Sequence, residues 1–345
     1  MTLVDGAALT RRGFLSGTVG ALTLAGCAGA PSPPAPAPRP LPPPPLRVPE
    51  LTRLLALAQL RWHVLARPRE IAEIPWMIPP IMRLAPEDNL SRFTAHVGFD
   101  LRQIPEAAVA SYAGEGGEAM FYLVRHNDDP LAIERLFRAR LTSGALRAVD
   151  RPDVVRVSGK IGPTPAALVV LGADVAGFQI GGSASRGPAR IASLYALDKL
   201  KKSPTVFTED PLRALQTRLG PAPFLAFAPG PFDGELARGA RGLLAGATAV
   251  GAAVRPSARE ALLAAVAVAG DFSRSGEPAS RQLVTAWGEL ASGSFGRLLG
   301  LDEPIQPPLP THGTDAVAMA VEVDPDKLAR GLAAATSARL EEIMR

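Results

Sequence analysis

The four histidines of this 345-residue chain, His63, His96, His126 and His312, are its first candidates for acid–base or metal chemistry. His312 lies three residues before Asp315, and the two could supply the base and the orienting carboxylate of a hydrolase triad. The chain has no Gly-x-Ser-x-Gly motif, which presents the serine nucleophile in many such enzymes. An envelope hydrolase that uses a serine with His312 and Asp315 is therefore kept as the alternative function.

Two further polar segments favour structural roles. Residues 126–129, His-Asn-Asp-Asp, are consecutive, so their side chains point in different directions instead of converging on one cation. Residues 181–187 are glycine-rich but lack both the dinucleotide-binding spacing and the Lys-Ser/Thr pair of phosphate loops. We expect no metal and no cofactor.

Composition excludes several classes of protein. One cysteine cannot build a disulfide framework or a cysteine-rich zinc module. The net charge is +4, and the 37 lysines and arginines are spread along the chain, so we expect no nucleic-acid partner. With 47% apolar residues, the chain has enough apolar surface for a substantial core.

The N-terminus carries two short motifs in order. Arg11 and Arg12 precede Phe14 and Leu15, and an uncharged, mostly apolar stretch of about 14 residues follows. Such a stretch is too short for a membrane span, which needs about 20 residues. The stretch ends in Leu-Ala-Gly before Cys27, the only cysteine of the chain.

The first motif resembles the signal of the bacterial twin-arginine export pathway, and the second resembles the lipobox of bacterial lipoproteins. The resemblance implies that residues 1–26 are a signal peptide, cut before a lipid-modified Cys27. It also implies a protein of the cell envelope that faces the periplasm and is anchored to the membrane. Ala28 is not the aspartate that retains some lipoproteins at the inner membrane, so the outer membrane is the expected location.

A proline-rich segment separates the cysteine from the folded part. Eleven of the nineteen residues 31–49 are proline, a composition that favours polyproline II and cannot bury surface. At roughly 3.1 Å per residue it spans up to about 60 Å, so residues 27–49 are expected to be a semi-rigid stalk.

The folded domain is expected over residues 50–345. Apolar residues at three- to four-residue spacing predict a first helix over 51–65, and the prolines of 75–86 predict a segment without long elements. Of the predicted strands, 247–254 and 261–269 are expected to form a hairpin. Runs of apolar and β-branched residues predict strands at 119–125, 154–161, 166–171, 175–180, 223–228, 247–254, 261–269 and 317–323.

Aspartate followed by proline begins three predicted helices, at Asp129, Asp210 and Asp324. Aspartate accepts hydrogen bonds from free first-turn N–H groups, and proline fits the first helical position. A strand followed by Asp-Pro and a helix occurs near residues 119–137 and again near 317–332, which suggests two similar halves, 50–205 and 206–345. The prediction is an α+β fold of two similar halves with largely antiparallel sheets and packed helices.

The weakest functional evidence concerns a ligand site. Residues 242–254 and 261–270 carry no charge, and Gly251 and Ala252 are small enough to leave room for another molecule. Arg255 and Arg259, in the link between these runs, could meet an anionic head group. The expected function is therefore a lipid-anchored envelope protein of binding or scaffolding type, whose partner is an envelope protein or an apolar small molecule.

Overall fold

The computed structural model describes residues 44–48, 50–114, 117–238 and 240–343. The signal residues Arg11, Arg12, Phe14 and Leu15 and the lipidation residue Cys27 lie outside this part. The compact unit starts at Pro44, six residues before the start expected from the sequence, and includes the end of the proline-rich segment.

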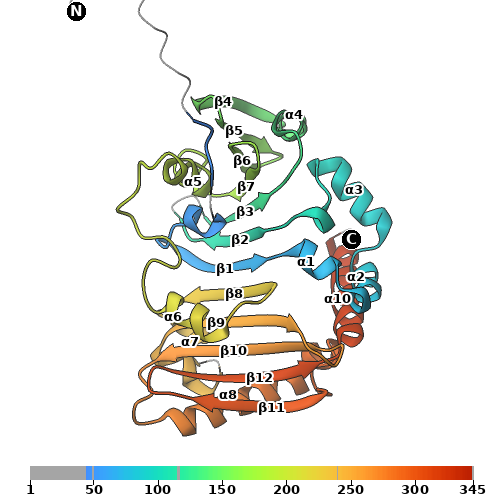
Figure 1. Ribbon diagram of the computed structural model, residues 1–345, viewed down its shortest axis with the longest axis vertical. Helices are drawn as coiled ribbons and strands as arrows, with labels where there is room; N and C mark the ends of the chain where they lie inside the picture. The colour runs from blue at the N-terminus through green and yellow to red at the C-terminus, as the bar shows by residue number, and fades with distance from the viewer. Residues whose placement is uncertain (1–43, 49, 115–116, 239, 344–345) are drawn as a thin grey trace, which may run out of the picture. The chain divides into compact units, whose positions relative to one another are not determined.

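The described residues form one sheet of twelve strands, in which every pair of neighbours is antiparallel (Figure 1). Together with the helices, this sheet confirms the predicted α+β class. Listed across the sheet, the strands are β11 (Gln306–His312), β12 (Ala316–Val323), β10 (Leu262–Gly270), β9 (Ala247–Pro256), β8 (Phe224–Pro229), β1 (Leu60–Ala66), β2 (Ala107–Tyr112), β3 (Ala119–Arg125), β7 (Val175–Gly181), β6 (Thr164–Leu171), β5 (Val154–Ile161) and β4 (Ser143–Arg151).

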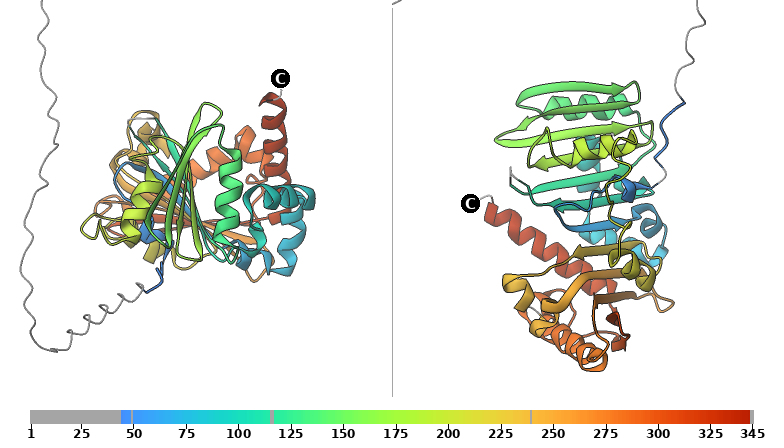
Figure 2. Two further views of the ribbon diagram at one scale, coloured as in Figure 1. Left: turned by 90° about the horizontal axis from the view of Figure 1, so that it is seen from above. Right: turned by 90° about the vertical axis from the view of Figure 1, so that its left-hand side faces the viewer.

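The helices lie on both faces and at one end of the strands (Figures 1 and 2). They are α1 (Pro68–Ala72), α2 (Ile78–Leu84), α3 (Glu87–Val97), α4 (Pro130–Arg140), α5 (Pro188–Ala196), α6 (Leu212–Leu219), α7 (Gly234–Arg238), α8 (Gly276–Ser292), α9 (Ser294–Leu298) and α10 (Pro325–Ile343). Short 3-10 turns occur at η1 (Leu51–Leu54), η2 (Pro75–Met77), η3 (Leu101–Gln103) and η4 (Ala240–Gly246).

The two halves of the chain follow a similar path within the one sheet. In the first half β1, β2 and β3 are sequential neighbours, α4 follows, and the returning strand β7 pairs with β3 before α5. In the second half β8, β9 and β10 are sequential neighbours, α8 follows, and β12 pairs with β10 before α10. The two strand-Asp-Pro-helix units are not equivalent in this path, because one follows the third strand and the other follows the last.

Alternate residues of each strand point to opposite faces of the sheet. The first face, which carries Phe121 and Phe227, is covered by η1, α5 and α6. On the second face, α3 and α4 cover Phe178, and α8 and η4 cover Met319. The second face is therefore covered by two separate groups of helices.

The predicted helix over residues 51–65 is wrong. Four of these residues form η1, and the chain then enters β1, which pairs with both β2 and β8 at the centre of the sheet. A β-bulge between Leu60 and Trp62 breaks the alternation that marks a half-exposed strand, so the apolar residues of β1 also fit a helical period. Because hydrogen bonds to β2 on one edge and to β8 on the other stabilise the extended conformation, residues 60–66 form a strand.

Other elements escaped the sequence patterns. The segment 75–86 contains the short elements η2 and α2, in line with the prediction, but the helix α3 that follows and carries His96 was not predicted. The strand β11 contains three prolines and lies at the edge of the sheet, where proline removes no interior hydrogen bond. The hairpin of residues 247–254 and 261–269 is confirmed as β9 and β10.

Two of the three predicted helix caps are confirmed. The Asp129 carboxylate accepts a hydrogen bond from a first-turn N–H at 3.0 Å, and Asp324 accepts two, at 2.8 and 3.1 Å. The prediction for Asp210 is wrong, because α6 begins at Leu212 and no side chain caps it. Asp210 instead faces Arg213 at 3.8 Å and lines a shallow pocket.

Candidate binding site

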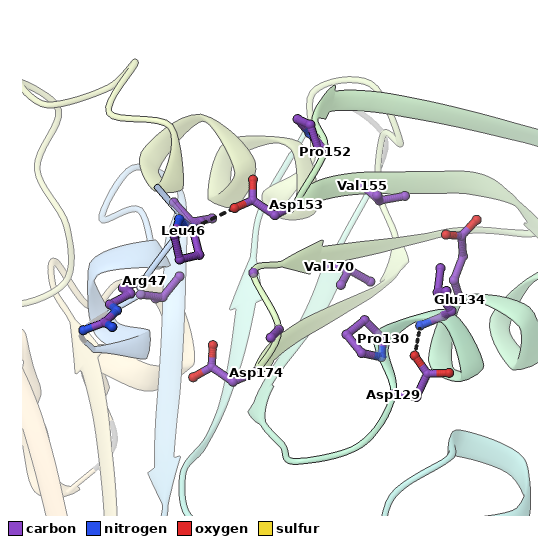
Figure 3. A pocket seen from close by; sticks show the side chains of 15 residues that line it. Leu46, Arg47, Asp129, Pro130, Glu134, Pro152, Asp153, Val155, Val170 and Asp174 are labelled. Atoms are coloured by element: carbon purple, nitrogen blue, oxygen red, sulfur yellow. Dashed lines mark hydrogen bonds between the residues drawn. The ribbon is translucent and has the colours of Figure 1, made fainter. Parts of the chain in front are cut away.

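A pocket of about 910 Å³ lies where the start of the compact unit crosses the ends of several strands (Figure 3). Its floor contains Val155 on β5 and Val170 on β6, and Pro130 and Leu131 at the start of α4 form one wall. We call residues 44–48 the strap, since Pro45, Leu46, Arg47 and Val48 form the opposite wall. The remaining lining residues are Asp129, Glu134, Pro152, Asp153, Gly172, Ala173 and Asp174.

The strap is fastened to the domain by its backbone. The Leu46 N–H donates to Asp153 Oδ2 at 2.7 Å, and Arg125 Nη2 donates to the Val48 carbonyl at 2.9 Å. Gly172 has a φ of +66°, and a Cβ there would lie 2.8 Å from the Leu46 carbonyl oxygen. A residue with a side chain would therefore push the strap away from the turn between β6 and β7.

The carboxylates around the pocket are occupied by donors of the chain itself. Glu134 on α4 forms an ion pair with Arg147 at 2.7 Å, and Asp153 forms one with Arg151, also at 2.7 Å. Arg125 contacts Asp174, and Asp129 caps α4. Arg47 is exposed and has no ion pair with another described residue. The pocket thus offers an apolar interior and a rim whose acids are already neutralised.

The structure leaves no cavity at Gly251 on the first face of the sheet. A Cβ at this position would lie 2.8 Å from Leu219 Cδ1 and 3.0 Å from Phe227, so the space left by the glycine is filled by the core under α6. On the opposite face, Gly251 and Ala252 line the same shallow hollow of about 240 Å³. Ala252 points to this face of β9 and is partly exposed.

Arg255 and Arg259 do not line that hollow. Arg255 ends β9, and Arg259 in the following turn lies 3.6 Å from Glu322 of β12. The predicted anionic head-group contact therefore has no pocket beside it, and Arg259 has a carboxylate partner within the chain.

His312 and Asp315 do not form the pair that a hydrolase triad needs. Asp315 forms an ion pair with Arg218 of α6 at 2.7 Å, and His312 is exposed at the end of β11. No hydrogen bond joins these two side chains or links His312 to a serine within the described residues.

Two other histidines are buried without partners. Both ring nitrogens of His63 and of His126 have no hydrogen-bond partner in the described structure. His63 stacks on Phe227, with ring centroids 5.2 Å apart, and contacts Phe207 edge-on at 5.3 Å. Burial lowers the pKa of His63 to about 3 and also lowers that of His126. Both rings are neutral core residues at pH 7.

The glycine-rich segment 181–187 connects β7 to α5. Gln179 holds it, because its Nε2 donates to the carbonyls of Gly181 at 2.9 Å and Ser183 at 3.1 Å. Its Oε1 accepts from the Ala189 N–H at 3.1 Å. No group of three or more possible metal ligands, and no helix long and apolar enough to cross a membrane, occurs in the described part of the chain.

Sequence reasoning missed the pocket beside the strap. The sequence predicts a helix start at Asp129 and Pro130 and a stalk at residues 45–48, and neither pattern indicates a pocket. The single available signal was the change from proline to Leu-Arg-Val at residues 46–48, which restores apolar side chains able to pack. The turns that complete the pocket, including Gly172, come from distant strands.

No protein-family model matches this chain, and no curated protein matches it significantly. Three crystal forms of the protein TP0453 are similar in structure. Form III has a TM-score of 0.49 and 10% identity over 84% of this chain and 99% of that chain. Form I has a TM-score of 0.47 and 7% identity over 82% and 96%, and form IV has 0.46 and 9% over 83% and 94%. A likeness of this degree concerns the path of the chain and says nothing of what the protein binds.

Proposed function

We propose that this protein is a lipid-anchored protein of the cell envelope whose folded domain binds an apolar ligand or the apolar segment of an envelope partner. The pocket between the strap and α4 carries the proposal. At about 910 Å³ it falls in the usual size range of small-molecule sites, about 300–1,000 Å³.

The polarity of the pocket favours an apolar occupant. Val155, Val170 and Leu131 present hydrocarbon, and Leu131 is 63% exposed although Ile133 and Phe137 of the same helix are buried. A cationic ligand would compete with the arginines that already pair with the rim carboxylates. An apolar ligand would gain about 25 cal/mol for each Å² of surface removed from water.

The position of the pocket also fits an anchored protein. The strap forms one wall and is the direct continuation of the proline-rich segment, so the binding site lies beside the tether. With Cys27 lipidated and the stalk extended, the site would lie within about 60 Å of the outer membrane surface.

The binding proposal is tested with the neutral fluorescent probe 1-N-phenylnaphthylamine and purified protein. Leu131→Asp places a charge in the pocket wall without removing core contacts, and an acid in the first turn of a helix favours that helix. Leu146→Asp is the matched control, because Leu146 is 72% exposed on the edge strand β4. We expect Leu131→Asp to weaken probe binding about tenfold or more, because apolar contact is lost and the bound probe would remove water from the new carboxylate, and Leu146→Asp to change it less than twofold. Equal effects of the two substitutions would contradict the proposal.

The export route is tested separately. Replacing Arg11 and Arg12 together by lysine should trap folded precursor in the cytoplasm if the twin-arginine pathway carries the protein. Unchanged export of this double variant would mean that the route is wrong.

A further inference from the structure

The second face of the sheet has an uncovered apolar area between its two groups of helices. Three large apolar side chains are exposed there: Trp62 by 36%, Tyr122 by 39% and Ile180 by 38%. Smaller, partly buried apolar residues connect them. We call this area the apolar strip, and its residues are Trp62, Val64, Val109, Met120, Tyr122, Ile180, Ala226, Ala228, Val250 and Ala252.

The strand register shows that the strip is continuous across six strands. One row runs from Ala252 through Ala226, Val64 and Val109 to Tyr122, each residue paired with the next on the neighbouring strand. The second row contains the pairs Val250 with Ala228, Trp62 with Ser111, Ser111 with Met120, and Met120 with Ile180.

Strand spacing gives the size of the strip. From β9 to β7 there are five spacings of about 4.8 Å, which gives a length of about 24 Å, and the two rows lie about 7 Å apart. The strip is thus long and narrow. It has the width of one aliphatic chain rather than of a protein interface.

A β-bulge places a cation on this strip. The register between β1 and β2 shifts between Leu60 and Trp62, so Arg61 is the extra residue. Leu60 and His63 are buried on the first face, whereas Arg61 and Trp62 are both exposed, as expected when a bulge turns two consecutive side chains to the same side. Within the described chain Arg61 forms no ion pair or hydrogen bond.

The neighbouring polar groups are few. Ser111, which connects Trp62 to Met120 in the second row, is fully buried, and its hydroxyl donates to Glu118 Oε1 at 2.5 Å. Among the described residues, Glu118 accepts this hydrogen bond and forms no ion pair with Arg61. The guanidinium of Arg61 is therefore available to an anion, with one nearby carboxylate acting against it.

The helices on each side restrict what can reach the strip. On the second face α4 packs on β6, and α8 packs on β11 and β12. A helix lying on a sheet stands about 10 Å above it, so a flat bilayer meets the helices first. A single chain can lie between them. The helix α10 projects away from the sheet (Figure 2).

We propose that the apolar strip with Arg61 is a second site, separate from the pocket beside the strap, that binds a long-chain fatty acid. Its carboxylate pairs with Arg61, and its hydrocarbon lies across β2 and β3 toward Ile180. From β1 to β7 there are three strand spacings, about 14 Å, the length of an extended chain of about 12 carbons.

The test is a titration of purified full-length protein with laurate, followed by Trp62 fluorescence and by calorimetry. We expect saturable binding of one laurate at the strip, with a fluorescence change that Trp62→Phe removes. Decanoate should bind about 4- to 16-fold more weakly, for two fewer methylenes. The neutral amphiphile dodecyl maltoside should bind more weakly than laurate.

Four substitutions separate the contributions of the two charges and of the two sites. Arg61→Glu should weaken laurate binding about tenfold without affecting dodecyl maltoside, and Arg135→Glu on the exposed side of α4 should change neither. Glu118→Gln should strengthen laurate binding, because it removes a nearby like charge. Leu131→Asp, which disturbs the other pocket, should leave this site unchanged.

Several results would overturn the proposal. They are equal binding of laurate and dodecyl maltoside, no effect of Arg61→Glu, binding to anionic lipid vesicles but not to laurate, and a dimer that buries Trp62 in the absence of lipid. Tyr122→Asp should abolish the fluorescence change while circular dichroism remains native. Since Arg61 and Glu118 are exposed, their variants keep the test valid if Tyr122→Asp fails to fold.

Discussion

His63 at the centre of the sheet makes the stability of the protein depend on pH in a way that one substitution should remove. Its side chain is fully buried on the first face, between Phe207 and Phe227, and neither ring nitrogen has a hydrogen-bond partner in the described structure. Burial lowers the pKa of His63 from 6.5 to about 3. The perturbation is His63→Phe, which keeps a flat ring and removes the titrating group.

Proton linkage gives the direction and the size of the pH effect on the free energy of unfolding. Below pH 6.5 the unfolded chain binds a proton at this residue and the folded chain does not, so the free energy of unfolding falls as the pH falls. The loss is about 1.4 kcal/mol per pH unit between 6.5 and about 3, and about 2 kcal/mol between pH 7.5 and pH 5. At pH 7.5, His63→Phe should be neutral or stabilising by about 1 kcal/mol, since it removes an unsatisfied buried polar group.

The assay is urea unfolding at pH 7.5 and pH 5 for the wild type, His63→Phe and His96→Gln. His126 also has a lowered pKa, but it is present in every protein and cancels in the comparison. We expect the pH-dependent loss to shrink by about 2 kcal/mol in His63→Phe and to stay unchanged in His96→Gln, whose ring is exposed on α3. An unchanged loss in His63→Phe would refute the burial of this ring.

The remaining predictions concern caps, packing and the anchor. Asp129→Ala and Asp324→Ala should each lower the free energy of unfolding by about 0.5–2 kcal/mol in urea titrations, whereas Asp210→Ala should cost little; a large loss for Asp210 would restore it as a cap. Gly251→Ala should cost about 1–3 kcal/mol by overpacking, measured in the same way, and a neutral result would reopen this position as a cavity. Cys27→Ser should leave the protein unprocessed or released from the membrane fraction, and a wild-type protein found in the aqueous phase of a detergent extraction would contradict lipidation.

Strands with a strong apolar or β-branched run could be predicted from the sequence, as β5 and the hairpin of β9 and β10 show. The central strand β1 could not be predicted, because it is stabilised by pairing along its two edges with β2 and β8. The residues of these strands lie about 45 to 165 positions away in the sequence. The same limit applies to β11, whose prolines are allowed only because no strand pairs beyond it in the described sheet.

The candidate sites were less predictable than the strands. Gly251 has the composition of a cavity wall, yet whether a small residue leaves space depends on what packs above it, here Leu219 of α6. The apolar strip has the same alternating pattern as the buried parts of the face. Only the placement of α4 and α8 decides which of these residues remain uncovered.

Native mass spectrometry of the protein purified from the cell envelope tests the central claim most directly. The proposed apolar ligand should appear as added mass on the wild-type protein and on Leu146→Asp, and organic extraction should release it. It should be absent or much reduced on Leu131→Asp, whose charge lies in the wall of the pocket beside the strap. Wild-type protein without added mass, or equal loading of the two variants, would contradict a binding role for this pocket.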